Sequence, residues 1–273
     1  MIQLLTVLLP TAYLAVLLAY AHDFLARSEN RHTRLRRTYF YATLALHAGL
    51  FVAYAVSVEG TPHLHRLHWV SAFGLVTGLL YAIVGEGSGG SRQGRAGVGL
   101  FVVALVFVLQ LVGSAFAPLS VTPHIGNPTF YALHIGTILL ASASLALSGT
   151  YGGLYLFLYR QMRGKKFGPA FRSLPSLSEL AALTRRASGY ACALLFIGVN
   201  GGIAWAHAKD VPEFSYSHPL VLLALGLCAH FALVAFSRQL PGMTPRRASV
   251  AAALGFGVFV GSLFVALAPG KFH

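Results

Sequence analysis

Histidine is the residue type in this sequence that is best placed to do chemistry. The 273 residues include 12 histidines but only seven Asp and Glu. His47 and His230 lie deep inside long apolar segments. Both are about 12–14 Å from the basic end of their segment, at 1.5 Å per helical residue. Two neutral imidazoles at one depth on different helices can ligate one haem iron from opposite faces. The alternative is that each histidine is hydrogen-bonded to a neighbouring helix.

A second set of histidines lies at the other ends of the apolar segments. His134 begins one segment and His273 ends the chain. They are accompanied by Trp205 and by an uncharged stretch over 118–130. These residues form either the usual aromatic belt of a membrane protein or a platform for a flat apolar ligand whose iron is bound by His134 and His273. The run from His63 to His68 could bind a divalent ion, although loop histidines are more often simply solvated.

The segments that carry these histidines are membrane-spanning in character. The chain is 56% hydrophobic and 10% charged, which excludes an ordinary soluble enzyme, a disordered chain and a disulfide scaffold. A spanning helix needs about 20 mainly apolar residues. We therefore predict an all-α polytopic membrane protein, a single domain over 1–273 with eight transmembrane helices at roughly 2–22, 38–58, 67–85, 97–117, 131–159, 188–207, 219–237 and 249–268.

Basic residues predict the orientation of these helices. Of the 20 Lys and Arg, 17 lie in the first, third, fifth and seventh gaps between segments. Under the positive-inside rule these gaps are cytoplasmic and both termini are outside. The expected location is the inner (plasma) membrane of a bacterial-type cell, with multiple passes through the lipid bilayer. The net charge of +13 does not indicate nucleic acid as a partner, because the charges sit in short gaps.

The two cysteines of the chain carry no metal-site or redox motif. Cys192 and Cys228 lie 36 residues apart inside apolar segments and form no CxxC motif. They are therefore read as small core residues, with no zinc site or thiol relay indicated. The stretch from Pro175 to Arg186 predicts an amphipathic helix with a capping box formed by Ser176 and Glu179.

The segment Leu174–His207 and the triplet Cys228-Ala229-His230 resemble parts of the cytochrome c assembly superfamily, which includes the CcsA, CcmC and HemX-like proteins. The stretch from His134 to Lys166 is similar to that family's helix from an external histidine to a basic inner end. The terminal Pro269–His273 is similar to its closing segment. The resemblance covers 130–273, with only the topology matching before that. The family's tryptophan-rich loop is replaced here by 208–218, and Trp205 alone remains of the surrounding pattern.

The resemblance implies a haem-binding role without a named enzymatic step. His134 and His273 correspond to an outer axial pair, and His230 to a ligand of a second, transmembrane haem. His47 is suggested as the partner of His230 by its depth. One or two haem b groups are the expected cofactors. The degenerate loop favours the HemX-like branch.

Three functions remain open from the sequence. The first is a membrane protein that holds or moves haem by bis-histidine ligation, with a cytochrome c assembly or tetrapyrrole-pathway protein as a partner. The second is a regulator or scaffold of tetrapyrrole biosynthesis that performs no haem chemistry. The third is a b-type electron-transfer subunit. Handling or regulation is expected rather than catalysis.

Overall fold

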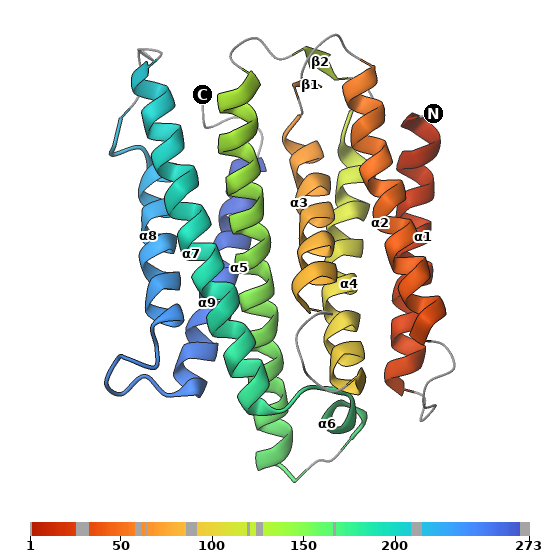
Figure 1. Ribbon diagram of the computed structural model, residues 1–273, viewed down its shortest axis with the longest axis vertical. Helices are drawn as coiled ribbons and strands as arrows, with labels where there is room; N and C mark the ends of the chain where they lie inside the picture. Colours follow the sequence, from red (N-terminus) through yellow and green to blue (C-terminus); the bar gives the residue numbers. More distant parts are fainter. Residues whose placement is uncertain are drawn as a thin grey trace. The chain divides into compact units, whose positions relative to one another are not determined.

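A computed structural model describes residues 2–25, 33–57, 62–63, 65–85, 92–118, 121–123, 128–165, 168–208 and 215–267. These residues are almost entirely helical, which confirms the predicted all-α fold class (Figure 1). The elements in chain order are α1 (Ile2–Leu25), α2 (Thr33–Val56), β1 (Pro62–His63), α3 (Arg66–Leu80), the π-helix η1 (Tyr81–Gly85), α4 (Arg92–Phe116), β2 (Thr122–Pro123), α5 (Pro128–Arg163), α6 (Pro169–Ser173), α7 (Leu177–Ala208), α8 (Pro219–Ala235) and α9 (Pro245–Leu267).

Six segments in the described part of the chain are long and apolar enough to cross a membrane: Ile2–Leu25, Arg34–Val56, Leu67–Val84, Gly97–Phe116, Leu133–Arg163 and Leu177–His207. The chain is thus a membrane protein by the length and composition of its helices. The helix α8 is apolar but shorter, with 17 residues. Helices occupy all eight predicted positions, while the number of spans and the side on which the termini lie stay predictions.

The predicted amphipathic helix has a different extent from the one expected. Residues from Leu177 onward belong to α7, which continues without a break through Arg186 to Ala208. The expected surface helix and the expected span at 188–207 are therefore one helix of 32 residues. The polar stretch does not end the helix because it contains no Pro or other strong helix breaker between Leu177 and the apolar part.

The chain divides into two compact units. Unit 1 comprises residues 1–125 and 158–176, and unit 2 comprises residues 126–157 and 177–273. The helix α5 contributes its first part to unit 2 and its last turns to unit 1. The single-domain organisation over 1–273 stays a prediction.

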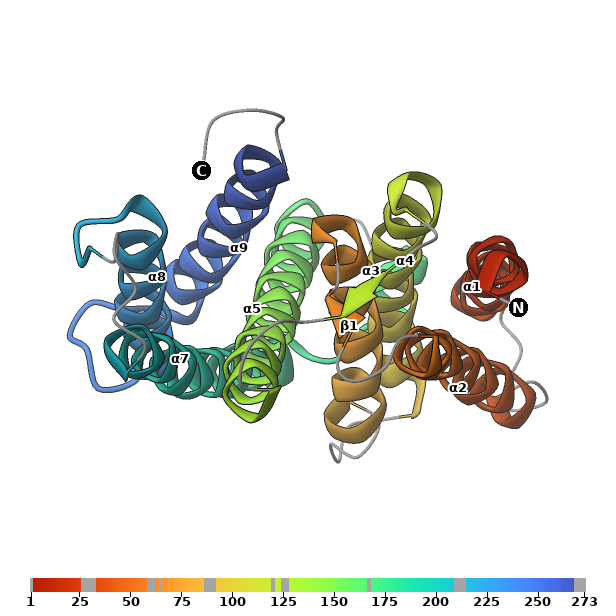
Figure 2. The same cartoon turned by 90° about the horizontal axis from the view of Figure 1, so that it is seen from above.

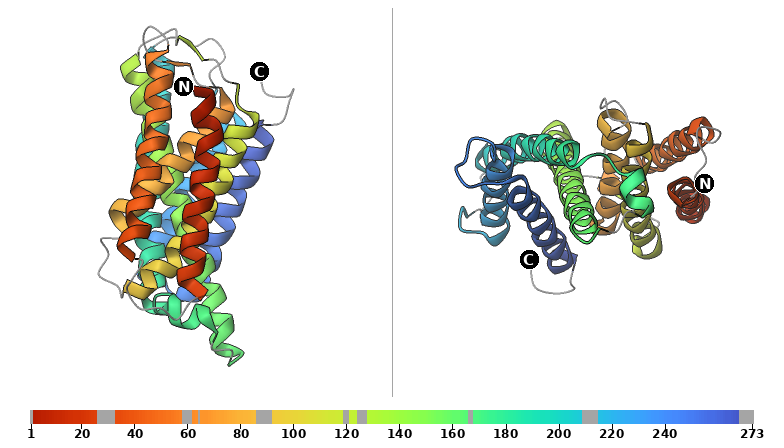
Figure 3. Two further views of the ribbon diagram at one scale, coloured as in Figure 1. Left: turned by 90° about the vertical axis from the view of Figure 1, so that its right-hand side faces the viewer. Right: turned by 90° about the horizontal axis from the view of Figure 1, so that it is seen from below.

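Unit 1 is built from α1, α2, α3 and α4, which pack as neighbouring helices (Figure 2). The short helix α6 lies against α4 and α1 (Figure 3). At the opposite end of the unit, β1 and β2 pair antiparallel with His63 facing Thr122. Arg36, which falls in the first predicted gap between segments, is buried, with 6% of its side chain exposed, and it donates to Asp23 Oδ2 over 2.7 Å. Its guanidinium lies 4.4 Å from the centre of the Tyr20 ring.

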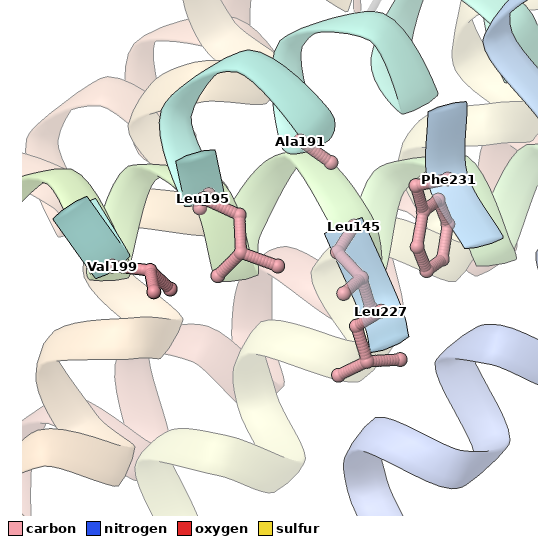
Figure 4. Close-up of a cluster of buried hydrophobic side chains, with 7 residues drawn as sticks. Leu145, Ala191, Leu195, Val199, Leu227 and Phe231 are labelled. Atoms are coloured by element: carbon pink, nitrogen blue, oxygen red, sulfur yellow. The ribbon is translucent and has the colours of Figure 1, made fainter. Parts of the chain in front are cut away.

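Unit 2 is organised around an apolar cluster shared by α5, α7 and α8. Its buried members include Leu145 of α5, Ala191 and Leu195 of α7, and Leu227 and Phe231 of α8 (Figure 4). Packing of this kind fixes the three helices relative to one another. The unit has two ends that differ in composition. The His134 end is where α5 begins, α7 ends and α8 begins, and the arginine end is where α7 begins, α8 ends and α9 begins (Figure 1).

Candidate functional site

His134 lies in the second turn of α5, at the His134 end of unit 2. Its Nδ1 is 2.8 Å from the carbonyl oxygen of Gly198 on α7. A carbonyl can only accept a hydrogen bond, so the proton of a neutral His134 is on Nδ1. The other ring nitrogen, Nε2, then carries a lone pair. This is the arrangement found in most metal-bound histidines, where one nitrogen donates to a carbonyl and the other binds the metal.

The approach of α7 to the His134 ring depends on a glycine. A Cβ atom at Gly202 would lie 2.7 Å from His134 Cε1, which is closer than such atoms come. The side chain of Trp205, three residues further along α7, is 38% exposed. Residues three apart lie on the same helix face. Gly202, which the His134 ring approaches, and Trp205 are therefore within one turn of each other along α7.

His47 in unit 1 has a different environment, because it is part of a chain of side-chain hydrogen bonds. Tyr13 Oη is 3.0 Å from His47 Nδ1, and His47 Nε2 is 2.9 Å from Ser71 Oγ. Ser71 Oγ donates to Gln110 Oε1 over 2.6 Å, and Gln110 Nε2 donates to Ser114 Oγ over 2.8 Å. The chain joins α1, α2, α3 and α4.

The direction of this chain follows from its end groups. The Gln110 Oε1 atom only accepts, so Ser71 uses its single proton there and must accept from His47. His47 therefore carries its proton on Nε2 and accepts from Tyr13 through Nδ1. Every donor gives to the next residue, and the His47 side chain is fully buried. Both of its ring nitrogens are occupied by other side chains.

His230 on α8 resembles His134 in part. Its Nε2 donates to the carbonyl oxygen of Ala251 on α9 over 2.8 Å. A Cβ at Gly255 would lie 2.8 Å from this same nitrogen, so α9 covers the outer edge of the ring. The deep haem site predicted for His47 and His230 stays a prediction: both ring nitrogens of His47 are hydrogen-bonded, and so is Nε2 of His230.

Two further histidines, His68 and His207, are engaged through both ring nitrogens. His68 accepts from the His65 backbone N–H at Nδ1 and lies 2.8 Å from the Pro118 carbonyl at Nε2. The predicted ion site along His63–His68 thus uses His68 as a helix cap. His207 donates to the Ile203 carbonyl and accepts from Tyr216 Oη at 3.2 Å. Within the described ranges, no group of three or more His, Cys, Asp and Glu side chains could hold a metal ion.

His273, the predicted partner of His134, lies outside the described residues. The pairing of these two histidines is therefore a prediction from the sequence. What the structure describes of the outer site is one half of it: the His134 ring, its backbone anchor at Gly198, and the exposed Trp205.

Comparison with known proteins gives one relationship. Protein HemX of Brevibacillus brevis is 24% identical to this chain over 221 residues, which is 80% of this chain and 79% of that protein. The chain is similar to HemX. No family model matches the chain, and no solved structure matches it at a significant level. The similarity supports a HemX-like relationship, while kinship to the wider cytochrome c assembly superfamily and the match of its motifs stay predictions.

Several residues of this HemX-like chain were not singled out from the sequence. The Gly198 carbonyl accepts a hydrogen bond from His134, and Gly202 leaves room for the His134 ring. Ser71 accepts a hydrogen bond from His47 and donates to Gln110. A signal existed for Gln110, because a polar amide within a long apolar segment is costly unless it has partners. No signal existed for the glycines, since α7 contains four of them and the sequence does not indicate which one faces α5.

Proposed function

We propose that this HemX-like membrane protein acts in haem synthesis or handling, and that it holds one haem at the His134 end of unit 2 with His134 as an axial ligand. The observation that carries the proposal is the hydrogen bond from His134 Nδ1 to the Gly198 carbonyl. This bond sets the tautomer in which Nε2 is free to bind a metal. The similarity to HemX over 80% of the chain supports a role connected with tetrapyrroles.

The residues at this end suit a flat, apolar ligand with a central metal. A haem supplies an iron that accepts an imidazole nitrogen as an axial ligand. His134 is the ligand from this side, and the exposed indole of Trp205 offers an apolar surface next to it. His273 is proposed as the second axial ligand, as the resemblance implies. The chain's own contribution is to bind and orient, so handling rather than catalysis is the proposed activity.

The proposed orientation places this site on the outer side of a bacterial-type inner membrane. Arg185, Arg186 and Arg238 lie at the arginine end of unit 2, opposite His134. Arg185 is close enough to the other two for their charges to repel. Basic residues concentrate on the cytoplasmic side of membrane proteins. We therefore propose eight spans, with the arginine end inside and both termini outside.

The proposal involves one haem and not two. The deep site of the sequence-based hypothesis needed His47 and His230. Hydrogen bonds to Tyr13 and Ser71 occupy both ring nitrogens of His47, and the bond to Ala251 occupies Nε2 of His230. The electron-transfer function depended on two sites in series, so it is not carried forward. His230 has a role in this proposal as an anchor between α8 and α9.

The test is the visible spectrum of the full-length protein purified from haem-replete cells. We expect a Soret band and, after reduction, a sharp α-band, with both lost in His134→Ala. The matched control is His230→Ala, which removes another carbonyl-bonded histidine of unit 2 and should keep the spectrum. His273→Ala should change the spectrum, because it removes one of two axial ligands. Unchanged haem content in a folded His134→Ala protein refutes the proposal, as does a colourless parent protein after haem supplementation.

A second function has its own support in the arginine end. Arg238, Arg246 and Arg247 are exposed there, and Arg247 Nη1 is held by the Gly242 carbonyl over 2.7 Å. Such a surface suits an acidic protein partner, as expected of a regulator or scaffold of tetrapyrrole synthesis. Replacing the three arginines by Gln tests this function. It predicts altered output of the tetrapyrrole pathway in cells with unchanged haem binding, and an unchanged output refutes it.

A further inference from the structure

The two cysteines of the chain meet across two helices. Cys192 Sγ on α7 is 3.8 Å from Cys228 Sγ on α8. Their distance of 36 residues in the sequence gave no indication of this contact. Both thiols are free and half-buried, and Cys228 Sγ also lies 3.5 Å from the Cys192 carbonyl oxygen. These are the features of a pair that can react with itself rather than of two separate core residues.

The helices around the pair are held firmly. Ala191 and Leu195 flank Cys192 on α7, and Leu227 lies beside Cys228 on α8; all three belong to the buried cluster of unit 2 (Figure 4). A disulfide has an S–S bond of about 2.05 Å. The two sulfur atoms therefore need to approach by less than about 2 Å. A side-chain rotation with a small helix adjustment achieves this without separating α7 from α8.

The depth of the pair selects the class of oxidant. Cys192 lies near the middle of α7, about 22–24 Å from either end at 1.5 Å per residue. Cys228 lies about 14 Å from the start of α8 on the same measure. Charged, water-soluble disulfides do not enter the hydrocarbon layer, since charged groups there are costly. A lipid-soluble quinone does enter it, and the thiols are only partly buried beside the apolar cluster of unit 2.

We propose that Cys192 and Cys228 form a redox-active dithiol within the membrane, which a quinone-class oxidant converts to a disulfide. In the reaction two S–H bonds break and one S–S bond forms. The two electrons and two protons pass to the quinone, which leaves as a quinol. The disulfide links α7 covalently to α8 and, like the dithiol, carries no charge, so an apolar interface accommodates both forms. This proposal does not depend on haem binding.

The experiment uses the full-length chain reduced and reconstituted in lipid vesicles. A short-chain ubiquinone is added, and free thiols are counted after denaturation by the gel shift of a maleimide-polyethylene glycol. We expect both thiols to be lost together, with one quinol formed per chain in this two-electron reaction. Intact mass should fall by two hydrogens, and dithiothreitol should restore both thiols. Oxidised glutathione at the same concentration should leave them free.

Cys192→Ser and Cys228→Ser are the matched variants. Each replaces one sulfur by an oxygen at the same place, so each should fold, keep its remaining thiol free and form no quinol. Three results overturn the proposal: both thiols of the parent staying free in the presence of the quinone, a mass gain from a quinone adduct, or a disulfide between two chains on a non-reducing gel. Haem content is measured in the same samples, which separates failure of this proposal from failure of the haem site.

Discussion

The two units of the molecule use the histidines that bridge their helices in different ways. In unit 1, His47 is bonded at both ring nitrogens by side chains from two other helices. In unit 2, His134 and His230 each give one nitrogen to a backbone carbonyl of a neighbouring helix. A histidine of the first kind has no position left for a ligand. A histidine of the second kind has its tautomer set and one nitrogen in reserve.

The difference shows that burial of a histidine can have a purely structural explanation. His47 is the more deeply buried residue, yet its burial is explained by a complete chain of donors and acceptors from Tyr13 to Ser114. Such a chain cannot conduct protons over its whole length by simple hopping, because the amide side chain of Gln110 does not readily take up or release a proton. Its role is to hold α1, α2, α3 and α4 in one arrangement.

The two carbonyl-anchored histidines of unit 2 also differ from each other. At His134 the donating atom is Nδ1, and Gly202 of α7 lies nearer to Cε1 and Nδ1 than to Nε2, from which a Cβ would be 3.4 Å away. At His230 the donating atom is Nε2, and α9 covers that edge at Gly255. The ring nitrogen that donates to the carbonyl therefore distinguishes His134, a potential ligand, from His230, a structural anchor.

The largest expected effect is a loss of stability when His47 of unit 1 is replaced. His47→Leu leaves Tyr13 without its acceptor and Ser71 without its donor, so the free energy of unfolding should fall by about 2–4 kcal/mol. Haem content per folded chain should not change. His134→Leu should do the reverse, with a small change in stability and loss of the Soret band. Unfolding in a mixed-detergent titration and the visible spectrum measure both. Loss of haem from folded His47→Leu protein would contradict the purely structural role given to His47.

Much of the fold could be predicted from the sequence, because apolar length alone marks a membrane helix. The helices at 2–25 and 92–116 are close to their predicted ranges. The start of α7 was missed, since a helix can run past the apolar region when no residue stops it, and the short helix α6 was not predicted. The division into two units was not visible, because it depends on which helices touch.

The candidate site was predictable in part for a related reason. The sequence identifies His134 as a possible ligand, but it cannot identify the partner of either ring nitrogen. That partner is a backbone carbonyl, and every residue has one. The Cys192–Cys228 contact was missed because it depends on how far α8 is rotated against α7. Both contacts depend on how neighbouring helices are rotated and shifted against each other, which the apolar pattern of the sequence does not determine.

The next largest effect concerns the covered edge of His230. Gly255→Ala puts a methyl group 2.7 Å from His230 Cδ2, so the ring or α9 must move. Overpacking of this kind costs about 1–3 kcal/mol. The control is Gly257→Ala, where a Cβ meets nothing within 4 Å. Unfolding titrations should distinguish the two variants, with haem content equal in both. Equal stability of the two variants contradicts the role of His230 as an anchor.

A smaller effect is expected at the potential ligand itself. Gly202→Ala pushes against the His134 ring at Cε1, while Gly201→Ala adds its methyl group in open space. Displacing the ring by a few tenths of an ångström should weaken haem binding about tenfold, or about 1.4 kcal/mol. Haem titration of the apoprotein measures this difference. If the two alanine variants bind haem equally, the ring of His134 is not at the binding site.

The smallest effect is expected for a feature that the two units share, a histidine at the N-cap of a helix. His65 caps α3 in unit 1 and His218 caps α8 in unit 2, and each accepts a backbone N–H two residues on at 3.3 Å. Loss of a helix cap costs about 0.5–2 kcal/mol, and these long, exposed bonds place both near the lower value. His65→Ala and His218→Ala should therefore lower the unfolding midpoint slightly and equally. Asn at either position should restore the midpoint, because its short side chain accepts the same N–H. A loss of haem in one of them alone would show that this histidine does more than cap its helix.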